Sequence, residues 1–241
     1  MLTPINAPAK RGYKAVHSSG TRDKAACQFI VTHCGEAGTA QGMASWFQNP
    51  SSGGSTQLCV DSDACYQPLP DLTIPWGAPP LNTTGLHCEL AGYSAWKPAD
   101  WLKRQRMLQR AAWQYAKWSI KYDIPIRWLT AKQLKQLTAV PGKGKGGFTS
   151  HAEISKAWGK TDHSDPGPGF LTASGSPSKT VPRLLLMGYV KKYRAQMLAP
   201  PKPPKKPKPP VKPKPPAKVK GAIWRLFQSM PWIPANQDRE K

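Results

Sequence analysis

The clearest hydrophobic signal in the chain is a short apolar run that ends in a histidine. Residues 28–33 read Gln-Phe-Ile-Val-Thr-His, and a continuous run of this length predicts a buried strand. A second strand is predicted over residues 84–90. A hairpin is predicted from residues 56–60 and 65–69, with Asp61 and Asp63 at its turn.

Helical spacing of apolar residues predicts four helices between these strands and after them. The first covers residues 39–48 and carries Met43, Trp46 and Phe47 on one side. A long helix is predicted over residues 97–122, because Pro98 suits a first helical turn. Thr130 is expected to cap a helix over 131–137, residues 142–147 to form a flexible loop, and the last helix to run over 182–197. Intermixed strands and helices indicate the α/β class.

A change in composition separates the C-terminal part of the chain from the rest. Residues 200–220 contain ten Pro and eight Lys, which predicts an extended polyproline II spacer. The predicted organisation is an N-terminal extension over 1–24, a folded domain over 25–198, a Pro/Lys-rich linker over 199–220 and a short segment over 221–241. That last segment is too short to fold alone, so it is either amphipathic, binding a membrane or a wall, or disordered.

The chain carries a large excess of positive charge. It has 35 Lys and Arg against 13 Asp and Glu, a formal net charge of +22. Such an excess attracts nucleic acid, anionic membranes or an anionic cell wall. Much of it lies in the Pro-rich tail and no standard nucleic-acid motif is present, so no specific nucleic acid is expected. We interpret the tail as a spacer and an electrostatic anchor rather than as a ligand for a folded partner domain.

Cysteine usage and the apolar runs bear on the cellular compartment. The chain has an odd number of cysteines and no CxxC pair, which argues against a disulfide framework and an all-cysteine zinc site; they are Cys27, Cys34, Cys59, Cys65 and Cys88. Reduced thiols made in a cytoplasm are expected. The first 20 residues have no apolar core typical of a signal peptide, and no run of about 18 apolar residues predicts a membrane span. If the protein acts beyond the membrane, it would therefore need a route across it other than a signal peptide.

Three of the five histidines stand in places that suit a metal site. His33 ends the predicted strand, and His151 and His163 also lie at strand ends or in polar loops. Asp165 begins an Asp-Pro-Gly-Pro turn that should hold its carboxylate rigidly. Two imidazoles and one carboxylate are a common catalytic zinc set. A single His is more often structural, and Asp162 is an alternative third ligand.

Other motifs admit ordinary explanations. His87 and Glu89 form an HxE motif as in zinc deaminases, but the PCxxC partner of that motif is absent. Cys34 follows His33 on a strand and should point to the opposite face, into the core. His17 is expected to be a solvated surface residue. Three tryptophans lie in segments that either flank a cleft or pack in the core: Trp46, Trp76 and Trp96.

Four segments taken together resemble one family. FIVTHCGE, TGLHCELAG, SHAEIS and KTDHSDPGPGF, in this order, are similar to the zinc-dependent type 2 N-acetylmuramoyl-L-alanine amidases, which are related to peptidoglycan-recognition proteins. The resemblance covers about residues 28–171, and phage endolysins of actinobacterial hosts look closest. It implies a central mixed β-sheet flanked by helices, here followed by a disordered Pro/Lys-rich tail.

The resemblance also implies roles for individual residues. His33, His151 and Asp165 match the zinc ligands of the family, and Glu89 matches its catalytic glutamate. His163 stands where many members carry Lys, which is a departure, although an imidazole can also donate a hydrogen bond to an oxyanion. Gln57 stands where relatives often carry His or Tyr, and it is given no catalytic role.

The activity that the resemblance implies is hydrolysis of peptidoglycan. Water activated by Zn²⁺ would cleave the amide between N-acetylmuramic acid and the L-alanine of the stem peptide, with Glu89 as the base and His163 as oxyanion stabiliser. The expected partner is the glycan strand with its stem peptide, and the expected state is a monomer acting on the wall after the membrane is permeabilised. A non-catalytic binding module of the same fold is the alternative, and the presence of both Glu89 and Asp165 argues for catalysis.

Overall fold

The computed structural model describes residues 3–138, 146–172 and 180–200. The chain divides into one compact unit, Met1–Ala199, and a second, Pro200–Lys241. Apart from Pro200, the predicted tail lies outside the described residues, so its proposed disorder and the domain boundaries stay predictions. Among the described helices, none has the length and apolar character needed to cross a bilayer.

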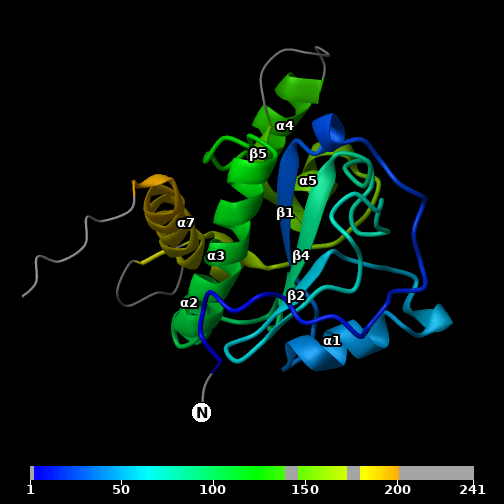
Figure 1. Cartoon of the computed structure of the whole chain (residues 1–241). Helices are drawn as coiled ribbons and strands as arrows, with labels where there is room; N and C mark the ends of the chain where they lie inside the picture. Colours follow the sequence, from blue (N-terminus) through cyan, green and yellow to red (C-terminus); the bar gives the residue numbers. More distant parts are fainter. Residues whose placement is uncertain (1–2, 139–145, 173–179, 201–241) are drawn as a thin grey trace, which may run out of the picture. The chain divides into compact units, whose positions relative to one another are not determined.

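A five-stranded mixed sheet forms the centre of the compact unit (Figure 1). Its strands are β1 (Phe29–Cys34), β2 (Leu58–Val60), β3 (Cys65–Tyr66), β4 (Gly85–Leu90) and β5 (Gly147–Ser150). Their order is β3-β2-β4-β1-β5, and each neighbouring pair is parallel except the antiparallel hairpin of β2 and β3. The predicted α/β class and mixed sheet are confirmed.

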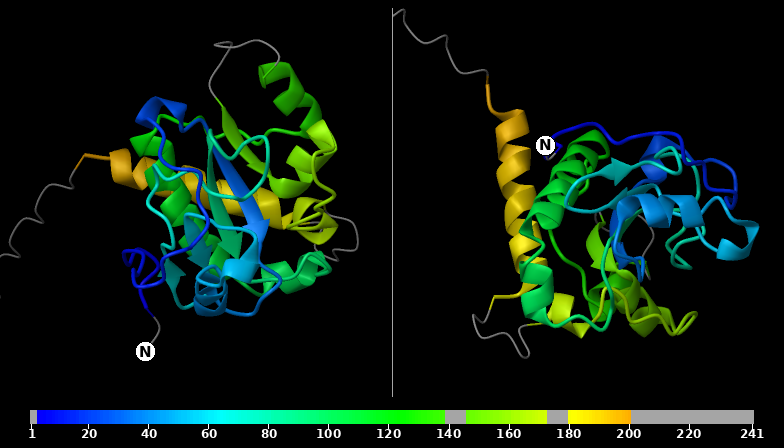
Figure 2. Two further views of the ribbon diagram at one scale, coloured as in Figure 1. Left: turned by 90° about the vertical axis from the view of Figure 1, so that its right-hand side faces the viewer. Right: turned by 90° about the horizontal axis from the view of Figure 1, so that it is seen from below.

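Alternation along β1 separates the two faces of the sheet. Ile30 and Cys34 belong to a core cluster with α3 (Gln105–Lys121), and the hydroxyls of Thr32 and Tyr115 lie 3.0 Å apart. The helix α7 (Pro182–Leu198) packs on α3 (Figures 1 and 2). On the other face, Phe29 and Val31 join a second cluster with α4 (Ala131–Thr138) and α5 (His151–Trp158). Cys34 is therefore a core thiol, as predicted, and all five cysteines are free and buried.

The prediction of one long helix over residues 97–122 is wrong, because two helices occupy this stretch. The first, α2, covers Pro98–Leu102, and α3 starts at Gln105 after Arg104 leaves helical geometry (φ −98°, ψ 33°). Trp101 and Met107 are both buried, yet their six-residue spacing would place them about 120° apart on one straight helix. The break between the helices allows both side chains to face the core.

Asp61 forms hydrogen bonds with both the helix α1 (Ala40–Trp46) and the predicted hairpin. One carboxylate oxygen accepts hydrogen bonds from the backbone N–H groups of Asp63 and Ala64 and closes the hairpin turn. The other accepts from the N–H of Ala40 and supplements the cap that Thr39 provides. The hairpin is confirmed, although β3 ends at Tyr66 rather than at residue 69.

The stretch around His151 differs most from the sequence-based expectation. Gly147 begins β5 instead of ending a flexible loop, while residues 139–145 lie outside the described part. His151 directly follows the end of β5 and is the first residue of α5, a helix capped by the Ser150 hydroxyl and ended by Gly159 at φ 61°. The remaining elements are 3-10 turns at Lys24–Ala26 and Pro50–Ser52 and the short helix α6 (Pro168–Leu171).

Residues 3–24 pack on the sheet and on α3. The backbone N–H of Lys10 donates to the carbonyl of Cys65 at the edge of the sheet. The fully buried guanidinium of Arg110 donates to the carbonyls of Thr3 and Pro4, both at 2.8 Å. This N-terminal segment (residues 3–24) is therefore part of the same packed unit as the sheet.

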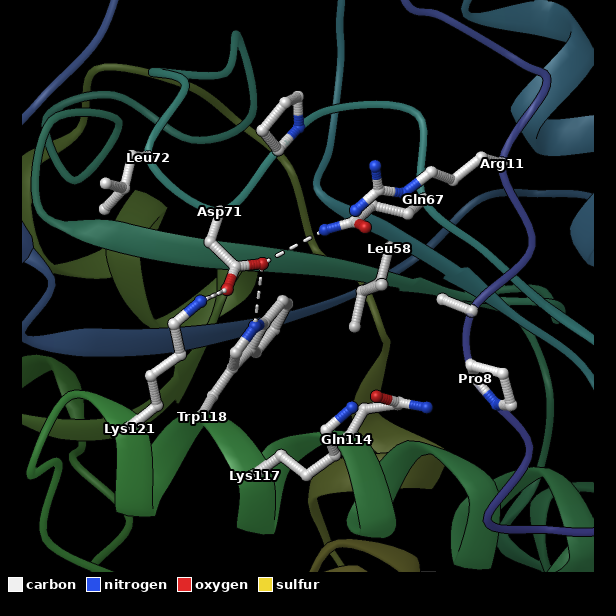
Figure 3. A pocket seen from close by; sticks show the side chains of 12 residues that line it. Pro8, Arg11, Leu58, Gln67, Asp71, Leu72, Gln114, Lys117, Trp118 and Lys121 are labelled. Atoms are coloured by element: carbon white, nitrogen blue, oxygen red, sulfur yellow. Dashed lines mark hydrogen bonds and ion pairs between the residues drawn. The ribbon is translucent and has the colours of Figure 1, made fainter.

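A pocket of about 530 Å³ lies between the N-terminal segment and α3 (Figure 3). Asp71 forms one side of it and accepts four hydrogen bonds: from Gln67 and Trp118 at 3.1 Å, and from Lys121 and Tyr122 at 2.8 Å. Burial raises the pKa of the Asp71 carboxyl, but hydrogen bonds from Lys121 and Tyr122 outweigh burial and lower it overall. The charged carboxylate thus fixes its loop to the C-terminal end of α3.

The variant Asp71→Asn is expected to lower the free energy of unfolding at pH 7 by about 2 kcal/mol, since bonds to a charged group are lost. The pKa of Asp71 is lower in the folded protein than in the unfolded chain, where it is about 3.9. The ionised carboxylate therefore stabilises the fold at pH values above about 3.9. That advantage over the variant should shrink as the pH falls below this value. Urea unfolding at several pH values measures the effect. The exposed Asp63→Asn is the control, with an expected change within about 0.5 kcal/mol.

Candidate metal centre and catalytic cleft

Three buried side chains from distant parts of the sequence meet beside the end of β1. His33, His151 and Asp165 each offer one ligand atom, and these atoms lie within 4.8 Å of one another. The Nδ1 atom of His33 is 3.1 Å from one oxygen of Asp165, and the Nδ1 atom of His151 is 3.2 Å from the other. The structure brings together all three residues predicted as ligands.

Parallel pairing of β1 and β4 places the predicted catalytic glutamate beside this cluster. His33 and Glu89 are register partners on adjacent strands. Their side chains lie on the same face, with Glu89 Oε1 3.9 Å from His33 Nδ1. Both stand near the C-terminal ends of their strands, where parallel sheets commonly carry their sites.

The turn after α5 holds Asp165 by its backbone. The carbonyl of Asp165 accepts a hydrogen bond from the N–H of Ala152, in the first turn of α5. Gly167 has φ 87° and packs so closely against the backbone of Ser94 that a Cβ would collide with it. The turn therefore fixes the carboxylate against His151, as the sequence predicted for Asp165.

The donor set and its unsatisfied atoms fit a zinc ion. Oδ1 of Asp165 and Oε2 of Glu89 are buried and have no hydrogen-bond partner among the described residues. Such atoms are costly unless a cation or a proton compensates them. Two imidazole nitrogens and one carboxylate oxygen converging on one point match a three-ligand catalytic zinc site.

The protonation equilibria of the cluster are strongly perturbed. Burial raises the pKa of Glu89 well above the usual carboxyl range, and the nearby Asp165 and Glu36 add to the shift. Burial also opposes ionisation of Asp165, but the adjacent imidazoles of His151 and His33 prevail and lower its pKa. Burial lowers the pKa of His151 and favours the neutral imidazole that a metal requires. Burial and the neighbouring groups thus shift the pKa values of the two carboxyl groups in opposite directions.

His163 lies on the open side of the cluster. Its ring stacks on His151, with centroids 4.1 Å apart, and its Nδ1 atom is 3.5 Å from Asp165. The side chain is 57% exposed, so it can reach a bound ligand. Asp162, the alternative third ligand, lines the same cleft but is exposed and is not one of the three clustered side chains.

The cluster lies in an open cleft of about 840 Å³ with exposed aromatic side chains. Trp46 and Trp76 line this cleft and are 51% and 43% exposed, whereas Trp96 packs against the core. His17, predicted to be a solvated surface residue, is partly exposed and also stacks on Trp76 at 4.6 Å and hydrogen-bonds the carbonyl of Pro50. The N-terminal segment therefore supports one wall of the cleft.

Two partners of the clustered histidines were not predicted from the sequence. Nε2 of His33 lies 3.0 Å from Nδ1 of His87, and Nε2 of His151 lies 3.3 Å from the hydroxyl of Thr161. Strand periodicity carries a signal for His87, because it stands two residues before Glu89 and so shares its face. Gln57 has a structural role, since its buried side chain accepts a hydrogen bond from the backbone N–H of His87.

Comparison with known proteins agrees with this geometry. The chain matches the family model described as N-acetylmuramoyl-L-alanine amidase over residues 23–168. No curated protein matches it. Among solved structures, the hydrolase AmiA of Staphylococcus aureus, in complex with its ligand, is 18% identical with a TM-score of 0.54, covering 80% of this chain and 87% of AmiA. That likeness shows a shared fold.

Two further solved structures are more distant. A mutant endolysin from Bacillus subtilis is 15% identical, with a TM-score of 0.43 and coverage of 64% of this chain and 87% of the endolysin. The amidase LysC from Clostridium intestinale is 12% identical, with a TM-score of 0.41 and coverage of 68% and 92%. The family match spans more than half of the chain and includes His33, His151 and Asp165. The chain therefore belongs to the N-acetylmuramoyl-L-alanine amidase family.

Proposed function

We propose that this protein is a zinc-dependent peptidoglycan hydrolase that cleaves the amide between N-acetylmuramic acid and L-alanine. The observation that carries the proposal is the buried cluster of His33, His151 and Asp165, with Glu89 at 3.9 Å from His33, in an open cleft. The family match agrees with this reaction. A binding module would not need a buried carboxylate with a raised pKa beside three metal ligands.

The proposed ligands are Nδ1 of His33, Nδ1 of His151 and the carboxylate of Asp165. A zinc ion held there would polarise the scissile carbonyl and lower the pKa of water from 15.7 to about 7. A cation at this place would also compensate the two buried carboxylate oxygens that have no hydrogen-bond partner among the described residues.

The protein's own side chains account for the proton movements of the reaction. Glu89 takes one proton from the attacking water while the water oxygen bonds to the lactyl carbonyl carbon. When the C–N bond breaks, Glu89 passes this proton to the nitrogen of L-alanine, which leaves a carboxyl group on the sugar and a free amine on the peptide. His163 donates a hydrogen bond to the carbonyl oxygen as that oxygen gains charge.

The variant His163→Ala is expected to reduce kcat by about 100- to 1,000-fold, the typical cost of losing one oxyanion donor. Zinc content should stay at the wild-type value, because His163 is not one of the three ligands. The variant His163→Lys restores a donor and should recover part of the lost rate. Steady-state hydrolysis of a soluble muramyl peptide measures both, and an unchanged kcat in His163→Ala would refute the assignment.

We extend the proposal to the biological setting as the family resemblance suggests. The protein would act as a monomeric endolysin on the bacterial wall, after release through a permeabilised membrane. The basic tail would contact anionic wall polymer or membrane. Residues 201–241 lie outside the described part, so the role of the tail stays a prediction that follows from its charge.

Mass spectrometry of digested peptidoglycan tests the proposed reaction. Stem peptides with a free N-terminal L-alanine should appear with the zinc-loaded protein, disappear after chelation and return when zinc is added. Intact sugar–peptide linkages on several wall types, together with co-sedimentation of the protein with those walls, would favour the binding module of the same fold.

A further inference from the structure

His87 makes a hydrogen-bonded chain with the proposed ligand His33. Its Nδ1 atom is 3.0 Å from Nε2 of His33, and its own Nε2 is 3.4 Å from the backbone carbonyl of Leu81. The His87 side chain is completely buried, and among the described residues no carboxylate lies within ion-pair distance of it. An imidazole in such surroundings is neutral and carries one proton.

The position of that proton follows from the carbonyl of Leu81. A carbonyl oxygen only accepts hydrogen bonds, so Nε2 of His87 must carry the proton and Nδ1 must be an acceptor. The partner atom, Nε2 of His33, must then be a donor. A neutral His33 with its proton on Nε2 has its lone pair on Nδ1, the atom that lies 3.1 Å from Asp165 in the proposed metal centre.

The surrounding backbone is shaped around the His87 ring. A Cβ atom added at Gly77 would collide with the ring at Nδ1 and its neighbours, and one added at Gly85 would come within 2.7 Å of Nε2. Gln57 fixes the strand at the same place, because its side-chain oxygen accepts the backbone N–H of His87 at 2.7 Å. Two glycines and a buried glutamine therefore hold the ring in register with His33.

We propose that His87 is a positioning residue for the metal centre, which holds His33 in the one tautomer and ring orientation that present a lone pair to the ion. This inference rests on the proposed zinc site and not on the hydrolytic reaction. Outer hydrogen-bond partners of this kind commonly contribute 10- to 100-fold to metal affinity. His87 does not touch the ion or the substrate, so it acts entirely through His33.

A matched pair of variants separates the hydrogen bond from the packing. His87→Leu and His87→Asn leave side chains of similar size, but the Asn oxygen can occupy the place of Nδ1 and accept the proton of His33. We expect His87→Leu to weaken zinc binding about 10- to 100-fold and His87→Asn to recover most of that loss. Zinc affinity of the full-length chain is measured by competition with a chelator, and the visible spectrum of the Co²⁺-loaded protein should change in His87→Leu alone.

Thermal unfolding of the metal-free proteins controls for a purely structural role, which would lower the stability of both variants equally and leave their zinc affinities equal. Equal zinc affinity in wild type, His87→Leu and His87→Asn overturns the proposal. Gly77→Ala should displace the ring, so this single substitution is expected to weaken zinc binding. Added to His87→Leu, the same substitution should weaken zinc binding no further. Tight, His87-dependent zinc binding in a protein that cleaves no wall would support this inference while contradicting the proposed reaction.

Discussion

The variant Glu89→Gln is expected to lose turnover by about 100- to 10,000-fold while it keeps its zinc. The amide has nearly the shape of the carboxyl group but cannot accept and return a proton, which is the contribution expected of a general acid–base group. Glu89 lies 3.9 Å from His33 and is not one of the three clustered ligands. Kinetics on a soluble muramyl peptide and zinc analysis of the same preparation measure the two properties together.

Glu36 provides a matched control in the same cleft. Its carboxylate lines the cleft and accepts a hydrogen bond from the backbone N–H of Ser94, which a glutamine oxygen can replace. Glu36→Gln should therefore retain most of the wild-type rate. If Glu36→Gln were as inactive as Glu89→Gln, or if Glu89→Gln kept its rate, Glu89 would not be the proton carrier.

The variant Asp165→Asn is expected to lose both metal and activity. The carboxylate lies between His33 and His151, and its Oδ1 atom is buried without a hydrogen-bond partner among the described residues. A neutral amide offers a much weaker ligand to a divalent cation, so zinc affinity should fall by more than about 100-fold, beyond the typical loss for an outer partner. Equilibrium dialysis against zinc measures the loss, and turnover should fall with occupancy.

Asp162 allows the assignment of the third ligand to be checked directly. It is three residues away, exposed and in the same cleft, so Asp162→Asn changes the local charge equally without touching the buried cluster. This variant is expected to bind one zinc per chain, the same content as is expected of wild type. Loss of zinc from Asp162→Asn with retention in Asp165→Asn would reverse the two roles.

The sequence pattern predicted the strands with continuous apolar runs and missed the element whose pairing is distant. β1 and β4 were predicted within a residue or two at their ends, as was α7. β5 has four residues, of which Phe148 alone is a large apolar side chain, and it becomes a strand by pairing with β1. Local periodicity carries no information about a partner so far away in the chain.

The candidate site was predicted to a similar degree. The family resemblance indicated His33, His151 and Asp165, and the structure brings them together. Strand periodicity places His87 on the face of Glu89, but its contact with His33 could not be predicted, because that contact depends on the register of β1 against β4 and on space left by Gly77. A motif of residues in order identifies the groups that perform the chemistry, whereas their supporting partners follow from the packing.

The packing of the N-terminal segment has a consequence for engineering. Composition suggests that an exchangeable unit begins near residue 25, yet residues 3–4 supply carbonyls to the buried Arg110 and His17 supports Trp76 in the cleft. A chimera joined at residue 25 would bury a guanidinium without those acceptors and leave one wall of the cleft unsupported. When domains are exchanged between wall-degrading enzymes, the N-terminal segment should therefore be transferred together with the domain that it packs against.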